Sequence, residues 1–219
     1  MARGTTTRET LLEAGWKLFL ERGFNHAGLD SILQAANVPR GSFYHFFGSK
    51  EEFGLAVLNR FVETIDDELE EHLGDESLRP LERLRRHGEA LYRRVESRQC
   101  RNGCLVGNLS QELADQSEAF RLRLDEVFRG WIGRYEACLR EAQADGELSN
   151  EVDPADLAEF WVCGWQGAIL RAKTTRSLSP VRTFLNLMFG YVLHTPRRDV
   201  SDALDSQGSE RNEAAIEGR

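Results

Sequence analysis

The chain has 219 residues, of which 41% are hydrophobic and 29% are charged, and its formal net charge at pH 7 is −8. This composition is typical of a soluble globular protein of one or two domains, and it excludes a disordered or collagen-like chain. No segment approaches the roughly 18 apolar residues of a membrane helix, and the polar N-terminus lacks a signal-peptide pattern, so we expect a cytoplasmic protein without membrane contact.

Hydrophobic periodicity predicts an all-α protein of about nine helices, because no segment shows the alternation that strands require. The first helix has candidate caps at residues 5–7 and ends at Gly23, and a short second helix spans residues 29–36. A turn at residues 37–41, where Asn and Gly tolerate positive φ, precedes a short third helix at 42–47. The other helices are expected near 50–73, which starts behind a capping box at 49–52, and near 80–98, 104–115, 117–144, 154–174 and 180–193.

The chain divides into a small N-terminal head, which we assign to residues 5–50, and a larger helical body at residues 51–195. From residue 196 to residue 219 the chain becomes polar and loses its periodicity, which predicts a disordered tail. The last four residues, Ile-Glu-Gly-Arg, match a common protease-cleavage linker and are set aside as a candidate remnant of engineering.

Two short helices joined by a tight turn, behind one supporting helix, form a helix-turn-helix pattern at about residues 29–48. In this arrangement the second short helix enters the major groove of DNA. Arg40 and Ser42 at its start are the candidates for contact with base edges, since Arg pairs with the acceptors of guanine. Tyr44 and His45 can donate hydrogen bonds to phosphates.

Lys50, at the start of the next helix, can neutralise a phosphate. The candidate DNA-binding set also includes Leu29, Gly41 and Phe43. Residues 1–60 carry seven Lys or Arg against six acids, a charge of +1, while the rest of the chain carries −9. This uneven charge permits a small DNA footprint on an acidic protein. The spacing alone is equally compatible with a three-helix module whose outer face is only solvated.

The residues of this motif carry a more specific signal. Residues 29–51, LDSILQAANVPRGSFYHFFGSKE, closely resemble the signature of the tetracycline-repressor (TetR) family of transcriptional regulators. Gly28 departs from the pattern, because many members have a Thr at this position that contacts a phosphate. In the body, residues 103–109 and 167–173 are similar to the branch that contains acrylate-responsive and N-ethylmaleimide-responsive repressors.

This resemblance implies an all-helical homodimer that binds a palindromic double-stranded operator and releases it when a small effector binds. Residues 51–195 would then form the effector-binding and dimerisation domain. The effector would be an electrophile or an unsaturated carboxylate, as in the similar branch.

Two apolar helices near the end of the chain are candidates for the dimer interface. Periodicity alone leaves open whether they form ordinary core or half of a four-helix seam with a second subunit. The resemblance favours the seam, and so does palindromic DNA binding, which needs two heads at a fixed separation. Their apolar residues are Phe160, Trp161, Gly164, Trp165, Ala168 and Ile169 on the first helix and Phe184, Leu185, Leu187, Met188, Tyr191 and Val192 on the second.

Cys104 is the candidate sensor residue of the body. It follows Gly103 at the start of a predicted helix, where free amides and the helix dipole stabilise a thiolate, and Arg98 and Arg101 lie close in sequence. The thiolate is the form that reacts with electrophiles and oxidants. The alternative is a small buried hydrophobe, which is the usual role of a free cysteine. Cys100, Cys138 and Cys163 are weaker candidates.

Lys173 ends an apolar run, so it either extends to solvent near a helix end or lines the effector pocket. In the pocket it would bind a carboxylate or lower the pKa of the Cys104 thiol. The candidate effector set also contains Asn108 and three tryptophans, which are either pocket walls or ordinary core: Trp131, Trp161 and Trp165.

Two alternatives to a repressor are a thiol enzyme and a helical interaction protein. A thiol enzyme that uses Cys104 lacks a partner for that residue, because His72 and His87 fall on faces that look polar and the other histidines lie in the head or near the tail. We therefore expect no enzyme activity. We also expect no cofactor and no metal, since the sequence has neither a Gly-rich phosphate loop nor a second cysteine pair. The third possibility is a helical interaction protein that does not bind DNA.

Overall fold

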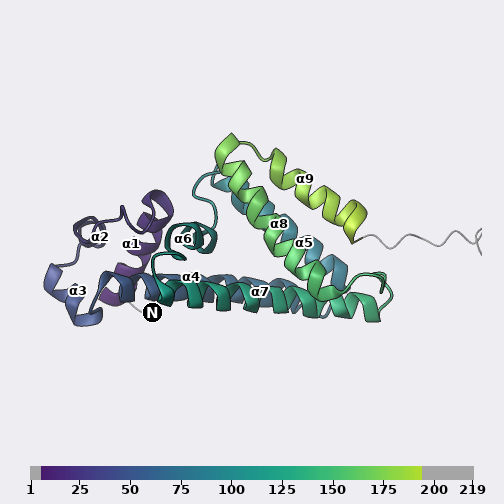
Figure 1. Ribbon diagram of the computed structural model, residues 1–219, viewed down its shortest axis with the longest axis horizontal. Helices are drawn as coiled ribbons and strands as arrows, with labels where there is room; N and C mark the ends of the chain where they lie inside the picture. The colour runs from purple at the N-terminus through teal and green to yellow at the C-terminus, as the bar shows by residue number, and fades with distance from the viewer. Residues whose placement is uncertain (1–5, 194–219) are drawn as a thin grey trace, which may run out of the picture.

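The computed structural model describes residues 6–193, and in this part of the chain every regular element is a helix (Figure 1). The all-α prediction of about nine helices is confirmed, whereas the tail at residues 196–219 lies outside the described residues. The elements are α1 (Thr7–Arg22), α2 (Leu29–Ala36), α3 (Arg40–Phe46), α4 (Lys50–Leu73), α5 (Pro80–Ser97), α6 (Leu105–Leu113), α7 (Glu118–Ala144), α8 (Pro154–Thr175), α9 (Ser179–Leu187) and the π-helical segment η1 (Met188–Val192).

Local capping explains where the first and fourth helices begin. Thr6 and Glu9 form a full capping box, in which Thr6 Oγ1 accepts from Glu9 N at 3.2 Å and Glu9 Oε2 accepts from Thr6 N at 2.7 Å. The box predicted at residues 49–52 is only half formed. Ser49 Oγ accepts from Glu52 N at 3.0 Å, but the Glu52 carboxylate accepts from Gly48 N instead of Ser49 N.

The turn between α2 and α3 is tighter than predicted. Asn37 closes α2 in the left-handed conformation, with φ 53°, as its residue type predicts. The predicted turn at residues 37–41 ends earlier, because α3 begins at Arg40 and already includes Gly41, whose φ is not positive.

An aromatic cluster holds the head together and joins it to α4. The Phe43 ring lies 5.3 Å from that of Phe53 on α4, and the Phe47 ring lies 5.0 Å from it. Phe19 of α1 completes the cluster at 5.9 Å. Because Phe53 belongs to the first turn of α4, this long helix starts inside the head and continues into the body (Figure 1).

In the body, α4 and α7 run side by side, and α5 and α8 pack above them (Figure 1). The short helix α6 lies where head and body meet, in contact with α1, α4 and α7. The outermost helix is α9, which packs against α8. No helix within residues 6–193 has the length and apolar character needed to cross a membrane.

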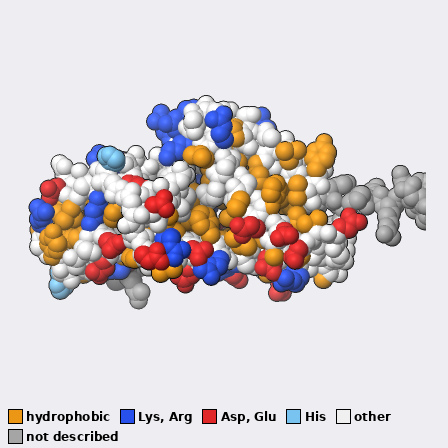
Figure 2. Space-filling model, viewed as in Figure 1, with side chains coloured by type: hydrophobic (Ala, Val, Ile, Leu, Met, Phe, Trp, Pro, Cys, Tyr) orange, Lys and Arg blue, Asp and Glu red, His pale blue; other side chains and the backbone are white. Residues whose placement is uncertain are grey.

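The predicted apolar face of α8 separates into two faces. Trp161 and Trp165 point into the core, whereas Phe160 and Leu170 are 54% and 46% exposed. On the last helical segments Leu187 and Tyr191 are also exposed, and Figure 2 shows hydrophobic side chains gathered over α8 and α9. These two helices therefore present an apolar surface as well as contributing to the core.

The close approach of α1 to α4 generates a stability prediction. A Cβ at Gly15 would meet Val57 Cγ2 at 2.8 Å and the Phe53 ring more closely still. We expect Gly15→Ala to destabilise the protein by about 1–3 kcal/mol, because overpacking forces neighbouring side chains to move. The control is Gly130→Ala on α7, where a Cβ meets nothing within 4 Å and the substitution should stabilise by about 1 kcal/mol. Denaturant unfolding of both variants at one protein concentration checks the pair, and a neutral Gly15→Ala contradicts the packing.

Candidate functional site

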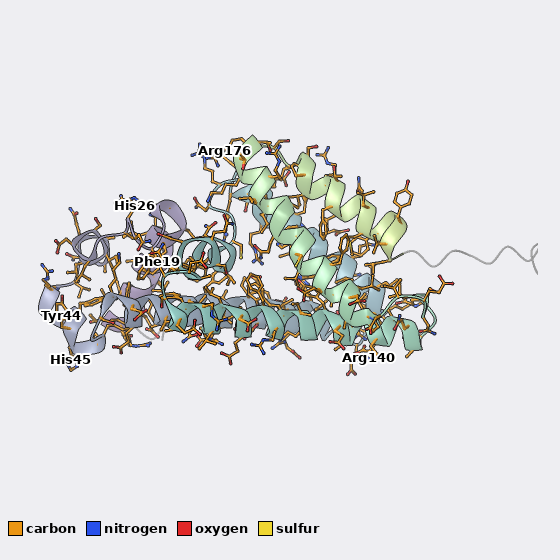
Figure 3. All side chains as sticks on the ribbon, viewed as in Figure 1. Phe19, His26, Tyr44, His45, Arg140 and Arg176 are labelled. Carbon is orange, nitrogen blue, oxygen red and sulfur yellow. The ribbon has the colours of Figure 1, made fainter. Side chains whose placement is uncertain are left out.

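The outer face of α3 is the candidate DNA-contacting surface. Arg40, Tyr44 and His45 are exposed on it, and Ser42 is half-buried. Figure 3 shows Tyr44 and His45 at the end of the molecule farthest from the body. The Arg40 guanidinium lies 3.4 Å from the Asp30 carboxylate, and both side chains are well exposed. Such an exposed pair is weak, so Arg40 is free to exchange its partner for a base edge.

Two members of the predicted DNA-binding set point inward. The Phe43 ring is completely buried in the aromatic cluster of the head, so its side chain cannot reach a duplex, and its role is to position α3. Leu29 is half-buried and packs against the same core, so its side chain mainly supports α2. Gly41 is exposed, and open space surrounds the position of a Cβ, which permits close approach of a DNA backbone.

Lys50, predicted as a phosphate ligand, has partners within the protein. Its Nζ donates to Phe24 O at 2.7 Å and to Asn25 O at 3.4 Å, and it lies 4.6 Å from the centre of the Phe24 ring. Burial lowers the pKa of Lys50, and the nearby Glu112 opposes that shift. The partly buried ammonium group therefore stabilises the loop between α1 and α2.

The body contains a mainly apolar cavity of about 80 Å³. Four predicted effector residues line it: Cys104, Trp131, Trp161 and Trp165. An apolar cavity of about 150 Å³ holds a benzene molecule, so this one suits a molecule of only a few heavy atoms.

A strained loop carries Cys104 to the edge of this cavity. Gln99, Cys100 and Asn102 all have positive φ between 53° and 69°, a conformation that non-glycine residues rarely adopt. Arg176 Nη1 donates to Cys100 O at 3.1 Å and thereby ties the loop to the end of α8 (Figure 3). Cys104 then forms the N-cap of α6, which confirms its predicted place at the start of a helix.

Positive charge gathers around Cys104. Arg98 and Arg101 line the cavity, and neither is in a salt bridge within residues 6–193, whereas Arg94 is paired with Glu68. Burial and the neighbouring Arg94 lower the pKa of the Arg98 guanidinium, and the negative charge that Cys104 can carry opposes this shift. Figure 2 shows further Lys and Arg side chains at the nearby end of α8. The mouth of the cavity therefore attracts anions although the protein as a whole is acidic.

The sequence did not predict a polar pair in the cavity wall, formed by His87 and Tyr135. His87 is buried, not on a polar face as expected, and its Nε2 lies 2.8 Å from Tyr135 Oη. Burial lowers the pKa of His87 to about 3, so the ring is neutral near pH 7 and is a poor base for a thiol. His87 Nδ1 and Trp161 Nε1 have no hydrogen-bond partner in the described part of the protein.

Two other predicted effector residues lie outside the cavity. Asn108 Nδ2 donates to Asn102 O at 2.7 Å, and Lys173 Nζ approaches Asn108 Oδ1 at 3.5 Å. Both border a surface groove with Glu112 between the end of α1 and α6. Lys173 therefore supports the loop that carries Cys104 from behind, and the structure does not place it among the cavity residues.

The other cysteines differ in their environments. Cys138 is buried, and burial raises the pKa of its thiol to about 12, which makes it unreactive near pH 7. Cys163 is exposed on α8, and burial and Glu159 raise the pKa of its thiol. Cys100 is buried beside the cavity.

Two family profiles together match most of the described chain. The profile described as "Bacterial regulatory proteins, tetR family" matches residues 11–57, and that described as "Tetracyclin repressor-like, C-terminal domain" matches residues 80–188. The HTH-type transcriptional repressor DhaR of Mycobacterium sp. (strain GP1) is 38% identical over 193 residues, or 88% of this chain and 95% of the relative. The transcriptional regulator AcuR of Cereibacter sphaeroides is 43% identical over 80% of each chain.

Solved structures show the same architecture. A regulatory protein TetR from Rhodobacter sphaeroides aligns with a TM-score of 0.79 at 41% identity, over 84% of this chain and 97% of that one. The reduced form of NemR from Escherichia coli aligns with a TM-score of 0.75 at 34% identity, over 87% of this chain and 98% of the other.

The contacts of Lys50 generate a prediction that distinguishes support of the α1–α2 loop from binding of a DNA phosphate. We expect Lys50→Met to leave the salt dependence of DNA binding unchanged, because the ammonium group faces the protein. If Lys50 bound a phosphate, its loss would instead reduce the slope of log affinity against log salt by about 0.9 per subunit. The combined change Tyr44→Phe and His45→Ala is the control for lost hydrogen bonds to phosphates, and it should weaken binding at every salt concentration. Titration of a selected palindromic duplex at several salt concentrations checks the prediction, and a reduced slope for Lys50→Met contradicts it.

Proposed function

Because the chain belongs to the TetR family of bacterial regulatory proteins, which are DNA-binding transcriptional regulators, we propose how this member is controlled. It is a repressor that releases a palindromic operator when a small effector occupies the body cavity or when the Cys104 thiol is modified. The observation that carries this proposal is the position of Cys104, which lies at once at the cavity wall and at the N-terminus of α6.

For DNA binding, we assign base contacts to Arg40 and Ser42 and phosphate contacts to Tyr44 and His45. All four lie on α3 and retain at least partial exposure. Gly41 allows the duplex to approach the helix backbone closely. We place this activity in the cytoplasm, where operator DNA is accessible.

The effector we propose is a small anion or a small electrophile. Arg98 and Arg101 provide positive charge at the cavity wall, and the aromatic side chains provide an apolar surface for the rest of the molecule. Cys104 lies at the start of α6, and the Arg98 guanidinium lines the same cavity. In reaction with an activated alkene, the thiolate forms a carbon–sulfur bond, the alkene π bond breaks, and water protonates the second carbon.

In this proposal, effector binding and covalent modification of Cys104 both lower the affinity for the operator. Either event expands a cavity of about 80 Å³ that is walled by α4, α5, α7 and α8, and it shifts α6, whose N-cap is Cys104. Only a ligand that prefers the expanded body changes operator affinity.

We propose that no substrate turnover accompanies effector binding. His87 lines the same cavity as Cys104, which makes it the residue that a thiol enzyme would use as a base. With its pKa lowered to about 3 and its Nε2 against Tyr135, it cannot take up the thiol proton near pH 7.

Members of this family are homodimers, and we propose that α8 and α9 form the dimer interface here. Phe160, Leu170, Leu187 and Tyr191 are four of the large hydrophobic side chains that remain exposed on the described chain. Phe160 and Leu170 lie on one face of α8, since ten residues amount to nearly three helical turns. A symmetric four-helix seam would bury this surface.

The sensor proposal is tested with N-ethylmaleimide as the probe. We expect the reagent to lower the operator affinity of the wild type by about tenfold or more, equivalent to about 1.4 kcal/mol, because the adduct is larger than the cavity. Cys104→Ser should abolish this response and keep the untreated affinity, while Cys163→Ser, which removes the thiol on the outer face of α8, should respond like the wild type. An unchanged response in Cys104→Ser contradicts the assignment of the sensor.

The interface proposal is tested by adding charge to the apolar surface. We expect Phe160→Glu together with Leu170→Glu to give a monomer, because burial of unpaired carboxylates is unfavourable. The control is Leu122→Glu, which changes an exposed leucine on α7 that lies outside the proposed seam. Sedimentation measures the oligomeric state, and an intact dimer for the double variant locates the interface elsewhere.

A further inference from the structure

The loop between α1 and α2 is held by a carboxylate from the body. Glu112, near the end of α6, accepts hydrogen bonds from Phe24 N at 2.8 Å and from Asn25 N at 2.7 Å. Gly23 permits this approach, because its φ is +80° and a Cβ there would lie 2.8 Å from Glu112 Oε2. Two amides on one carboxylate form short, directional, charge-assisted bonds.

The opposite side of the same loop is held by Lys50, whose Nζ donates to the carbonyl oxygens of Phe24 and Asn25. The Phe24 ring lies between the ring of Phe19 in the head, at 5.2 Å, and the ring of Phe120 in the body, at 5.3 Å. The loop is therefore fixed at its amides, its carbonyls and its one aromatic side chain. Of these contacts, only the one to the amides comes from α6.

Helix α6 connects this contact to the cavity. Cys104 is its N-cap and lines the cavity, whereas Glu112 lies eight residues farther along, a distance of about 12 Å at 1.5 Å per residue. Leu105, Val106 and Leu109 are completely buried, so the helix is held along its inner side and moves as a unit. A displacement at the Cys104 end therefore reaches the Glu112 end.

We propose that Glu112 is the positioning residue that fixes the angle of the reading head relative to the body. This inference rests on the proposed function, because it concerns how two heads are presented to one operator. The two heads of a dimer must meet successive major grooves about one helical turn apart. When the Glu112 contact is lost, each head stays folded around its aromatic cluster, but the separation between the heads is no longer defined.

The proposal predicts different effects of losing Glu112 on the affinity for a full operator and on the affinity for a half-site. A single head reads a half-site without reference to its partner, so the loss of Glu112 leaves that affinity unchanged. Binding of the full palindrome requires both heads at once, so it weakens. The preference for the correct spacing between half-sites weakens as well, because a loosely held head reaches a displaced half-site more easily.

The test compares wild type, Glu112→Ala, Glu112→Gln and the control Gln111→Ala, which changes an exposed neighbour on the same helix. The probes are a palindrome selected from random duplexes with the wild type, its half-site, and a version with two base pairs inserted at the centre. For Glu112→Ala we expect about tenfold weaker binding of the palindrome, half-site binding within about twofold, and a smaller preference over the inserted version. Glu112→Gln, which keeps one acceptor oxygen, should fall between.

Equal losses on palindrome and half-site would show that Glu112 only supports the fold of the head, and no loss would show that it does not position the head. Either result overturns the proposal. If the wild type selects no palindrome, the proposed function fails, and this inference fails with it.

A second measurement separates this proposal from the sensor. With N-ethylmaleimide, the affinity of Glu112→Ala for the palindrome should change by less than about threefold, although Cys104 reacts at the wild-type rate. A full response in this variant overturns the coupling through Glu112. If the wild type itself does not respond but the spacing result holds, the role of Cys104 is rejected and the positioning role of Glu112 is supported.

Discussion

The structure depends on the continuity of α4, which belongs to the cores of both the head and the body. Phe53 at its start completes the aromatic cluster behind the reading helix, and Phe61 and Leu69 farther along reach the wall of the cavity. A helix of this length is stiff, so a change in the cavity wall cannot remain local. The head has a second attachment through α6 and the α1–α2 loop, and together the two attachments define its orientation.

Much of the helical framework was predictable because it depends on local chemistry. Thr6, Asn37 and Pro154 act through neighbours within a few residues, so caps and turns place most helix ends to within one or two residues. The position of Cys104 at the start of α6 followed from Gly103 for the same reason. The motif at residues 29–51 adds specificity that periodicity alone cannot supply.

Interactions between distant parts of the chain were not predictable. Lys50 finds its partners 25 and 26 residues away, and His87 meets Tyr135 across 48 residues. The Glu112 contact spans 88 residues. A helical wheel assigns a polar side chain to solvent, and only tertiary packing turns His87 and Lys50 toward the protein. Phe43 was misassigned for the converse reason, because a residue within a recognition motif can serve it by packing.

The tryptophans of the cavity give the body an intrinsic optical probe. The chain has four tryptophans, and Trp131, Trp161 and Trp165 surround the cavity, while Trp16 packs on Phe61 at the junction with the head. Indole emission responds to the polarity and to the quenchers around the ring. Three of the four indoles therefore lie where a guest molecule would be held, and occupancy should be visible in the unlabelled protein, in the absence of any nucleic acid.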